Sequence, residues 1–125
     1  MATLRKALLV EDEVLVAALA VDALEELGYQ IVEAATAKAA LEHARGGIEA
    51  FALAIIDVGL PDGRGDALAL QLREMRADLP IIIATGYGES GLDGRLRDKQ
   101  VVVLGKPYDI SQLYAAITSI TQGPR

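Results

Sequence analysis

Five short and largely apolar runs recur along the chain, spaced so that a helix fits between each pair. The third run includes Ala52 to Ile56 and stops abruptly on the carboxylate of Asp57. Apolar runs of this length are typical of strands that are buried on both faces of a sheet. The predicted strands are Lys6–Val10, Gln30–Ala34, Phe51–Ile56, Ile81–Ala84 and Val101–Leu104.

The segments between these runs have apolar residues at helical spacing. The predicted helices are Val14–Leu27, Ala37–Arg45, Asp66–Ala77, Glu89–Lys99 and a last one that follows Asp109. Gly28 suits the C′ position that ends the first helix, and Asp109 with Gln112 forms a variant of the capping box. In the fourth helix, Gly91 and Gly94 each cost about 1 kcal/mol, so we expect a short or mobile helix there.

Strands that alternate with helices in this way pair in parallel and are joined by right-handed crossovers. We therefore expect an α/β fold, a flavodoxin-like three-layer α/β/α sandwich with five parallel strands in the order 2-1-3-4-5. The strand order follows from the fold class, because periodicity alone does not encode it. The 125 residues suit one domain, so we expect a single domain over residues 1–125 with no output domain visible.

The first predicted helix has apolar residues on more than one face. Its spacing turns one set toward the core: Val16, Leu19, Ala20, Ala23, Leu24 and Leu27. The set that remains outside is also apolar: Val14, Leu15, Ala17, Ala18 and Val21. An exposed apolar patch of this kind favours contact with another protein.

Composition and charge narrow the class of protein. Apolar residues make up 52% of the chain and charged residues 24%, which is typical of a globular domain. The absence of cysteine excludes disulfides and thiolate metal sites, and suits a reducing compartment. The net charge of −6 disfavours nucleic acid, whose binding needs a basic surface.

The sequence also disfavours membrane contact. The longest uninterrupted apolar stretch, Val14–Val21, is far below the roughly 18 residues that span a bilayer. The amino terminus leads into a short apolar run that meets Glu11-Asp12-Glu13, and this run is too brief and too acidic for a secretory signal. We therefore expect a cytoplasmic protein.

Residues with useful chemistry stand at the carboxyl ends of the predicted strands. Glu11 and Asp12 follow the first strand, and Asp57 ends the third. Because these strands are neighbours in the expected order, the three carboxylates should meet at the edge where open α/β sheets bind ligands. Such close like charges call for a cation, and Mg²⁺ (or Mn²⁺) with oxygen ligands suits them. The backbone carbonyl of Gly59 is placed to add another oxygen.

A carboxylate at this edge can attack a phosphoryl group and form an aspartyl phosphate. The charge that develops on the phosphoryl oxygens needs positive partners, which the metal and Lys106 would supply. Thr85, at the end of the fourth strand, could donate a hydrogen bond. These residues predict that Asp57 is a phosphate acceptor in a signalling switch.

Several motifs follow one another in a characteristic order: Glu11-Asp12, Asp57 with Pro61 and Gly65 behind it, Ala84-Thr85, and Lys106-Pro107. By these motifs the chain resembles a response-regulator receiver domain of two-component signalling over essentially its whole length. The resemblance implies a signalling protein that is not an enzyme, apart from self-catalysed phosphotransfer and autodephosphorylation. It further implies Asp57 as the phosphoacceptor and Asp12, Asp57 and the Gly59 carbonyl as direct Mg²⁺ ligands, with Glu11 acting mainly through water.

The resemblance implies that Thr85 and Lys106 engage the phosphoryl group, and that Lys106-Pro107 forms the family's cis peptide bond. One departure concerns the position three residues before the lysine, where Val103 replaces the usual tyrosine or phenylalanine. The stretch around Thr85 instead resembles a divergent subgroup with an Ala-Thr-Gly signature, in which Tyr87 takes over part of the signalling. Gly59 and Tyr87 occupy the positions that tune dephosphorylation in the family.

The implied partner is a histidine kinase or a histidine phosphotransfer protein. It would dock on the first helix, at Val14, Leu15, Ala18 and Val21, and on the loop after Lys106. A homodimer seam is the other use of that surface. His43 is predicted on a helix surface away from the strand ends, so we assign it neither a phosphodonor nor a metal-ligand role.

Three other functions are compatible with parts of the sequence. A receiver-shaped binding module that does not use phosphate is the main alternative, because of Val103. A nucleotide or flavin binder on the same fold would need a Gly-rich loop after the first strand, where this chain has carboxylates. A haloacid-type phosphatase would need a second carboxylate two residues after Asp57, where Gly59 stands.

Overall fold

The computed structural model describes residues 5–86, 92, 94–96 and 101–122. Its strands are β1 (Lys6–Val10), β2 (Gln30–Ala34), β3 (Phe51–Asp57), β4 (Gly59–Leu60), β5 (Gly63–Arg64), β6 (Ile81–Thr85) and β7 (Val101–Gly105). Its helices are α1 (Val14–Glu26), α2 (Ala37–Arg45), α3 (Gly65–Met75) and α4 (Ile110–Gln122), with 3₁₀ turns η1 (Ile48–Ala50) and η3 (Gly94–Leu96).

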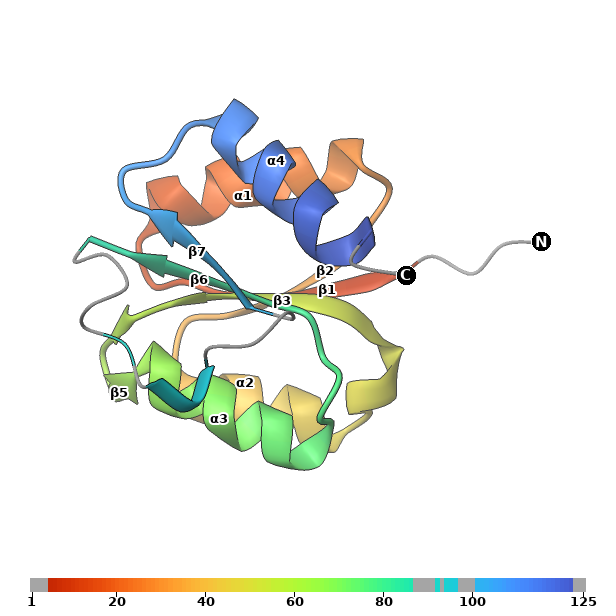
Figure 1. Ribbon diagram of the computed structural model, residues 1–125, viewed down its shortest axis with the longest axis vertical. Helices are drawn as coiled ribbons and strands as arrows, with labels where there is room; N and C mark the ends of the chain where they lie inside the picture. Colours follow the sequence, from red (N-terminus) through yellow and green to blue (C-terminus); the bar gives the residue numbers. More distant parts are fainter. Residues whose placement is uncertain (1–4, 87–91, 93, 97–100, 123–125) are drawn as a thin grey trace.

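The main sheet is parallel and has the order β2-β1-β3-β6-β7. Counted along the chain, this is the predicted order 2-1-3-4-5. Helices α1 and α4 cover one face of the sheet, and α2 and α3 cover the other (Figure 1). The predicted flavodoxin-like sandwich is therefore confirmed.

Both faces of the sheet are packed, which explains the continuous apolar runs. Successive strand residues supply opposite layers. Leu9 and Ile55 pack with α1 and α4, whereas Leu8 and Ile56 pack with α2 and α3. A strand with helices on both faces has no solvated side, so it shows no polar alternation.

The predicted helix ends have the expected local structure. Gly28 follows α1 with a φ of 89°, a conformation that favours glycine. At the start of α4, the Gln112 N–H donates to Asp109 Oδ1 and the Asp109 N–H donates to Gln112 Oε1, both at 2.8 Å. This reciprocal pair is the predicted capping box.

Two expectations for α1 are wrong. Ala17, expected outside, is buried, and Leu27, expected in the core, is 42% exposed. The helix ends at Glu26, so Leu27 no longer continues the buried stripe. Ala17 lies one turn before buried Ala20, where its small side chain allows the helix to approach the sheet closely.

Two further differences concern short elements. Of the helix expected over 89–99, only η3 and residue 92 lie among the described residues, and η3 is a single 3₁₀ turn. The antiparallel hairpin of β4 and β5 was not expected. In the described part of the chain, no helix is long and apolar enough to cross a membrane.

Candidate phosphoryl-transfer site

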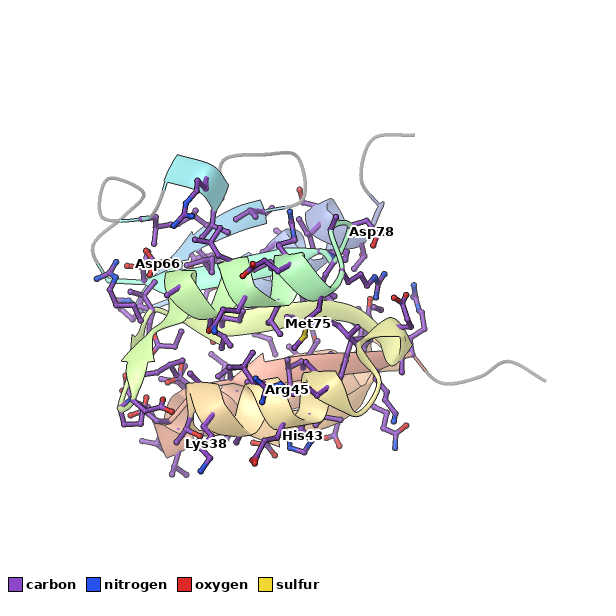
Figure 2. The ribbon with its side chains drawn as sticks, turned by 90° about the horizontal axis from the view of Figure 1, so that it is seen from below. Lys38, His43, Arg45, Asp66, Met75 and Asp78 are labelled. Carbon is purple, nitrogen blue, oxygen red and sulfur yellow. The ribbon has the colours of Figure 1, made fainter. Side chains whose placement is uncertain are left out.

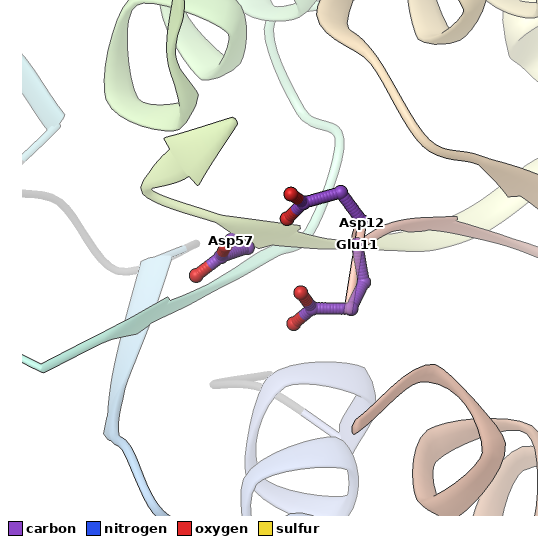
Figure 3. A group of neighbouring side chains, drawn as sticks. All are labelled: Glu11, Asp12 and Asp57. Carbon is purple, nitrogen blue, oxygen red and sulfur yellow. The ribbon is translucent and has the colours of Figure 1, made fainter. Parts of the chain in front are cut away.

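Three carboxylates meet at the carboxyl edge of the sheet. Glu11 and Asp12 follow β1, and Asp57 ends the adjacent strand β3 (Figure 3). One oxygen from each side chain lies within 4.8 Å of the others, as expected from the strand order. Glu11 and Asp57 are buried, whereas Asp12 is exposed. The cluster therefore has two desolvated carboxylates and one that faces solvent.

Lys106 extends into this cluster from the end of β7. Its backbone N–H donates to the carbonyl of Thr85 at 2.9 Å, which fixes the lysine beside β6. Its Nζ lies 3.1 Å from Asp57 Oδ1 and 3.3 Å from Glu11 Oε1. A third carboxylate, Glu13, accepts from the same ammonium at 3.0 Å. One cation thus contacts three acids that come from two different segments.

The contacts shift the protonation equilibria of these groups. Burial raises the pKa of Glu11, with a further contribution from the charge of Asp57, although the N–H of Glu13 and the ammonium of Lys106 oppose the rise. Burial alone would lower the pKa of Lys106. Hydrogen bonds to Glu13 and Asp57, together with the charges of Glu11 and Asp57, outweigh burial and raise this pKa above its usual value. Lys106 is therefore a permanent cation at neutral pH.

A cavity of about 370 Å³ opens over Asp57. It is lined by Glu13, Asp57, Val58, Gly59, Thr85, Gly86 and Lys106. Sequence reasoning assigned no site role to Glu13, because an acid in that position suits the start of a helix equally well. The sequence signal that could have identified Glu13 is its position directly after the acidic pair Glu11-Asp12.

Gly65, the first residue of α3, packs against the backbone of Asp57. A Cβ at this position would lie 2.0 Å from the Asp57 carbonyl oxygen and 2.9 Å from Ile56 Cγ2. The Gly65 N–H also donates to the Val58 carbonyl at 2.8 Å. A residue with no side chain is therefore required for α3 to begin this close to the site.

The other predicted site residues are Thr85, the Lys106–Pro107 peptide bond and Tyr87, together with Val103. Thr85 is 2% exposed at the end of β6 and lines the cavity, and Val103 is half-buried in β7. The Lys106–Pro107 peptide bond is cis, as expected. Tyr87 lies outside the described residues.

Two further residues differ in position, since His43 lies away from the site and Tyr108 lies beside it. His43 is exposed on α2 (Figure 2), where it lines a pocket with Lys6 and Phe51 at the start of β1 and β3. Tyr108 was not singled out from the sequence, although it directly follows the cis proline. Burial, with the negative charges of Glu11 and Asp57, raises the pKa of Tyr108 to about 12, so its phenol is neutral beside the site.

The acidic cluster fits a small divalent cation. Mg²⁺ prefers carboxylate, carbonyl and water oxygens, and the three clustered side chains supply carboxylate oxygens within 4.8 Å of one another. Gly59 lines the cavity next to them, so its backbone lies at the same site. The residues present therefore match the donor set of a magnesium site.

A parallel sheet in this order, with an acidic cluster and a lysine at its carboxyl edge, defines the CheY-like class of flavodoxin-like folds. The receiver domain of the hybrid histidine kinase CckA aligns with a TM-score of 0.79 and 30% identity, covering 94% of this chain and 99% of that one. The family described as the response regulator receiver domain matches residues 7–118. The chain belongs to this family, whose members are signalling modules of two-component systems.

Two curated relatives illustrate the range of proteins that carry this domain. Sensor kinase CckA of Brucella abortus is 32% identical over 116 residues, which cover 92% of this chain and 12% of the kinase. The transcriptional regulatory protein PdtaR of Mycobacterium tuberculosis is 35% identical over 115 residues, which cover 90% of this chain and 55% of PdtaR. The chain thus spans only part of the length of these relatives.

Proposed function

We propose that the chain is a phosphorylatable receiver in which Asp57 accepts a phosphoryl group from a histidine kinase or a histidine phosphotransfer protein. The observation that carries the proposal is the placement of the Asp57 carboxylate. It stands between two other acids and an ammonium that contacts its Oδ1 at 3.1 Å, beneath an open cavity. An ordinary surface carboxylate is solvated by water and does not require an ammonium and a cavity beside it.

In the proposed reaction, an Asp57 carboxylate oxygen attacks the phosphorus of a phosphohistidine. The new O–P bond forms as the P–N bond breaks, and the electron pair of the P–N bond leaves with the imidazole nitrogen. Lys106 then donates to a phosphoryl oxygen in place of the carboxylate oxygen, and Thr85 adds a hydrogen bond from the neighbouring strand β6. Hydrolysis reverses the state when water attacks the phosphorus and releases inorganic phosphate.

A bound Mg²⁺ would neutralise the charge that develops on the phosphoryl oxygens. Asp12, Asp57 and the Gly59 carbonyl would hold it directly, and Glu11 would act through water. Both oxygens of Glu11 already accept hydrogen bonds, Oε1 from Lys106 at 3.3 Å and Oε2 from the Glu13 N–H at 3.1 Å, which fits a role outside the innermost ligand set.

The signal would be a shift between two conformations. Hydrogen bonds from charged groups contribute roughly 1.5–3 kcal/mol each when they form in one state only. Reversing a 1:99 population takes about 5.5 kcal/mol, so new bonds from Thr85 and Lys106 together are about sufficient. Tyr87 lies outside the described residues.

The partner would bind beside the site on α1. Val14 and Leu15 are 80% and 85% exposed, and Ala18 is exposed next to them. Val14 and Ala18 also line a groove of about 600 Å³, and Asp12, Asp22 and Glu33 give it an acidic rim. A kinase or phosphotransfer helix with apolar and basic residues would match both features.

Incubation with acetyl phosphate and Mg²⁺, followed by intact mass spectrometry, tests the proposal. The wild-type chain should gain the mass of one phosphoryl group, and Asp57→Asn should gain none. Asp78→Asn changes an acid of the same type far from the site and should behave as wild type (Figure 2). If the wild-type chain gains no phosphate under these conditions or from any of a panel of phosphorylated kinases, it is a binding module that does not use phosphate.

A further inference from the structure

The loop that follows Asp57 is attached to a helix on the other side of the site. Pro61 and Asp62 form the tip of the β4–β5 hairpin, in which Leu60 pairs with Gly63. From this tip, the Asp62 carboxylate accepts two backbone hydrogen bonds from the first turn of α2. Its Oδ1 lies 2.8 Å from the N–H nitrogen of Ala37, and its Oδ2 lies 3.0 Å from that of Lys38.

These bonds complete a cap that α2 does not supply alone. Thr36 is the N-cap residue, and its Oγ1 accepts from the Ala39 N–H at 3.0 Å. The first two N–H groups of the helix are then satisfied by a residue that lies 25 positions away from Ala37 in the sequence. Both bonds lower the pKa of Asp62, with that from Ala37 having the larger effect. The carboxylate is therefore charged at neutral pH, which strengthens the contact.

The same junction also positions the acidic pair. The carbonyl of Ala34, at the end of β2, accepts the backbone N–H of Glu11 at 3.0 Å. The segment 34–38 thus contacts the loop that carries Glu11 and Asp12 on one side and the hairpin that carries Gly59 on the other. It therefore bridges the two loops whose oxygens would hold the metal.

We propose that Asp62 is a positioning residue for the metal site, which holds the β4–β5 hairpin against α2 and so fixes the Gly59 carbonyl relative to Asp12 and Asp57. The hairpin has two residues in each strand, too few to hold its own shape. Its base has other anchors: Leu60 is buried, the Val58 N–H donates to the Ala84 carbonyl at 3.0 Å, the Gly65 N–H donates to the Val58 carbonyl, and Arg64 pairs with Asp66. None of these contacts involves Pro61 or Asp62 at the hairpin tip. The inference rests on the proposed function only in its assignment of Gly59 as a ligand.

Asp62→Ala and Thr36→Ala form a matched pair that separates positioning from capping. Each substitution removes side-chain hydrogen bonds from the start of α2, but only Asp62→Ala releases the hairpin. Mg²⁺ affinity is measured by calorimetry, and amide hydrogen exchange of residues 58–64 is measured without metal. Asp62→Ala should weaken Mg²⁺ binding by about tenfold, as the loss of an outer partner of a metal ligand does. It should also raise hairpin exchange severalfold.

Thr36→Ala should leave both quantities within about twofold of wild type, since the hydrogen bond that its side chain accepts comes from Ala39 within α2. Asp62→Asn keeps one oxygen acceptor and should fall between Asp62→Ala and wild type. The proposal is overturned if Thr36→Ala and Asp62→Ala change the two quantities equally, or if Asp62→Ala leaves hairpin exchange unchanged. Failure of the wild-type chain to bind Mg²⁺ would refute the proposed metal site, and the exchange measurement without metal would still decide whether Asp62 holds the hairpin.

Discussion

Substituting Gly65 with alanine tests how tightly the site depends on the start of α3. The added Cβ would lie 2.0 Å from the carbonyl oxygen of Asp57, whereas real Cβ contacts are at least about 3.0 Å. Either the helix or the Asp57 backbone must therefore move by about 1 Å. Leu68 and Leu72 are buried one and two turns further along α3, so a shift of the helix disturbs the core as well.

The expected loss of stability has two parts. Forcing an extra methyl group into a packed interior costs about 1–3 kcal/mol. Lengthening the hydrogen bond from the Gly65 N–H to the Val58 carbonyl costs about 1 kcal/mol more. The free energy of unfolding should fall by about 3 kcal/mol in Gly65→Ala, which lowers the melting temperature by roughly 10 °C.

Urea unfolding measures the stability, and the rate of phosphorylation by acetyl phosphate reports whether the Asp57 carboxylate is still correctly placed. A misplacement of about 1 Å at a reacting group should slow phosphorylation at least about tenfold. Gly94→Ala is the matched control, because nothing lies within 4 Å of the Cβ added there. It should stay within about 0.5 kcal/mol of wild type. A Gly65→Ala variant as stable and as reactive as Gly94→Ala would refute the close contact.

Three other perturbations follow from the charges of the site. Lys106→Met leaves the buried carboxylates of Glu11 and Asp57 without their cation, so at neutral pH the free energy of unfolding should fall by about 2 kcal/mol or more. Saturating Mg²⁺ should restore part of this loss. Equal stability of the variant and the wild-type chain would contradict the ion-pair geometry. Glu13→Gln removes a charge that two successive contacts of 3.0 and 3.1 Å place within about 6 Å of Asp57. Because acetyl phosphate is an anion, phosphorylation should speed up about threefold at low salt, and the gain should shrink as salt is added; a slower variant would mean that Glu13 orients the lysine instead. The pKa of Tyr108, raised to about 12, means that the folded chain keeps a proton that the unfolded chain loses above about pH 10. Stability should therefore decline by about 2–3 kcal/mol between pH 10 and 12, and Tyr108→Phe, followed by alkaline denaturation and phenolate absorbance, should show a shallower decline.

Much of the site was predictable because it is attached to strand ends. In a parallel sheet, the carboxyl end of each strand lies at one edge, so finding Asp57 and Lys106 after apolar runs was enough to bring them together. To predict that Glu11 and Asp12 converge with Asp57, one further inference was needed, namely that the first and third strands are neighbours in the sheet. That inference came from the fold class and is confirmed by the sheet order.

Other contacts could not be predicted from a local sequence pattern. Glu13 looks like an ordinary acid at a helix start, and its contact with Lys106 joins residues that are 93 positions apart. Asp62 looks like a turn residue, and its role in capping α2 depends on where the hairpin tip lies in space. Leu27 has the right spacing for the core, yet the helix ends one residue too early for it to be buried.

The sequence by itself determined the alternation of strands and helices, the doubly covered sheet and the residues that stand at its carboxyl edge. These depend on periodicity, glycine and capping residues, which act within a few positions along the chain. Only the tertiary structure decided which acids share the ammonium of Lys106, how closely Gly65 approaches Asp57 and which helix Asp62 caps. Those contacts depend on the separation of elements that are distant in sequence, and this separation is set by the packing of whole layers and not by any local pattern.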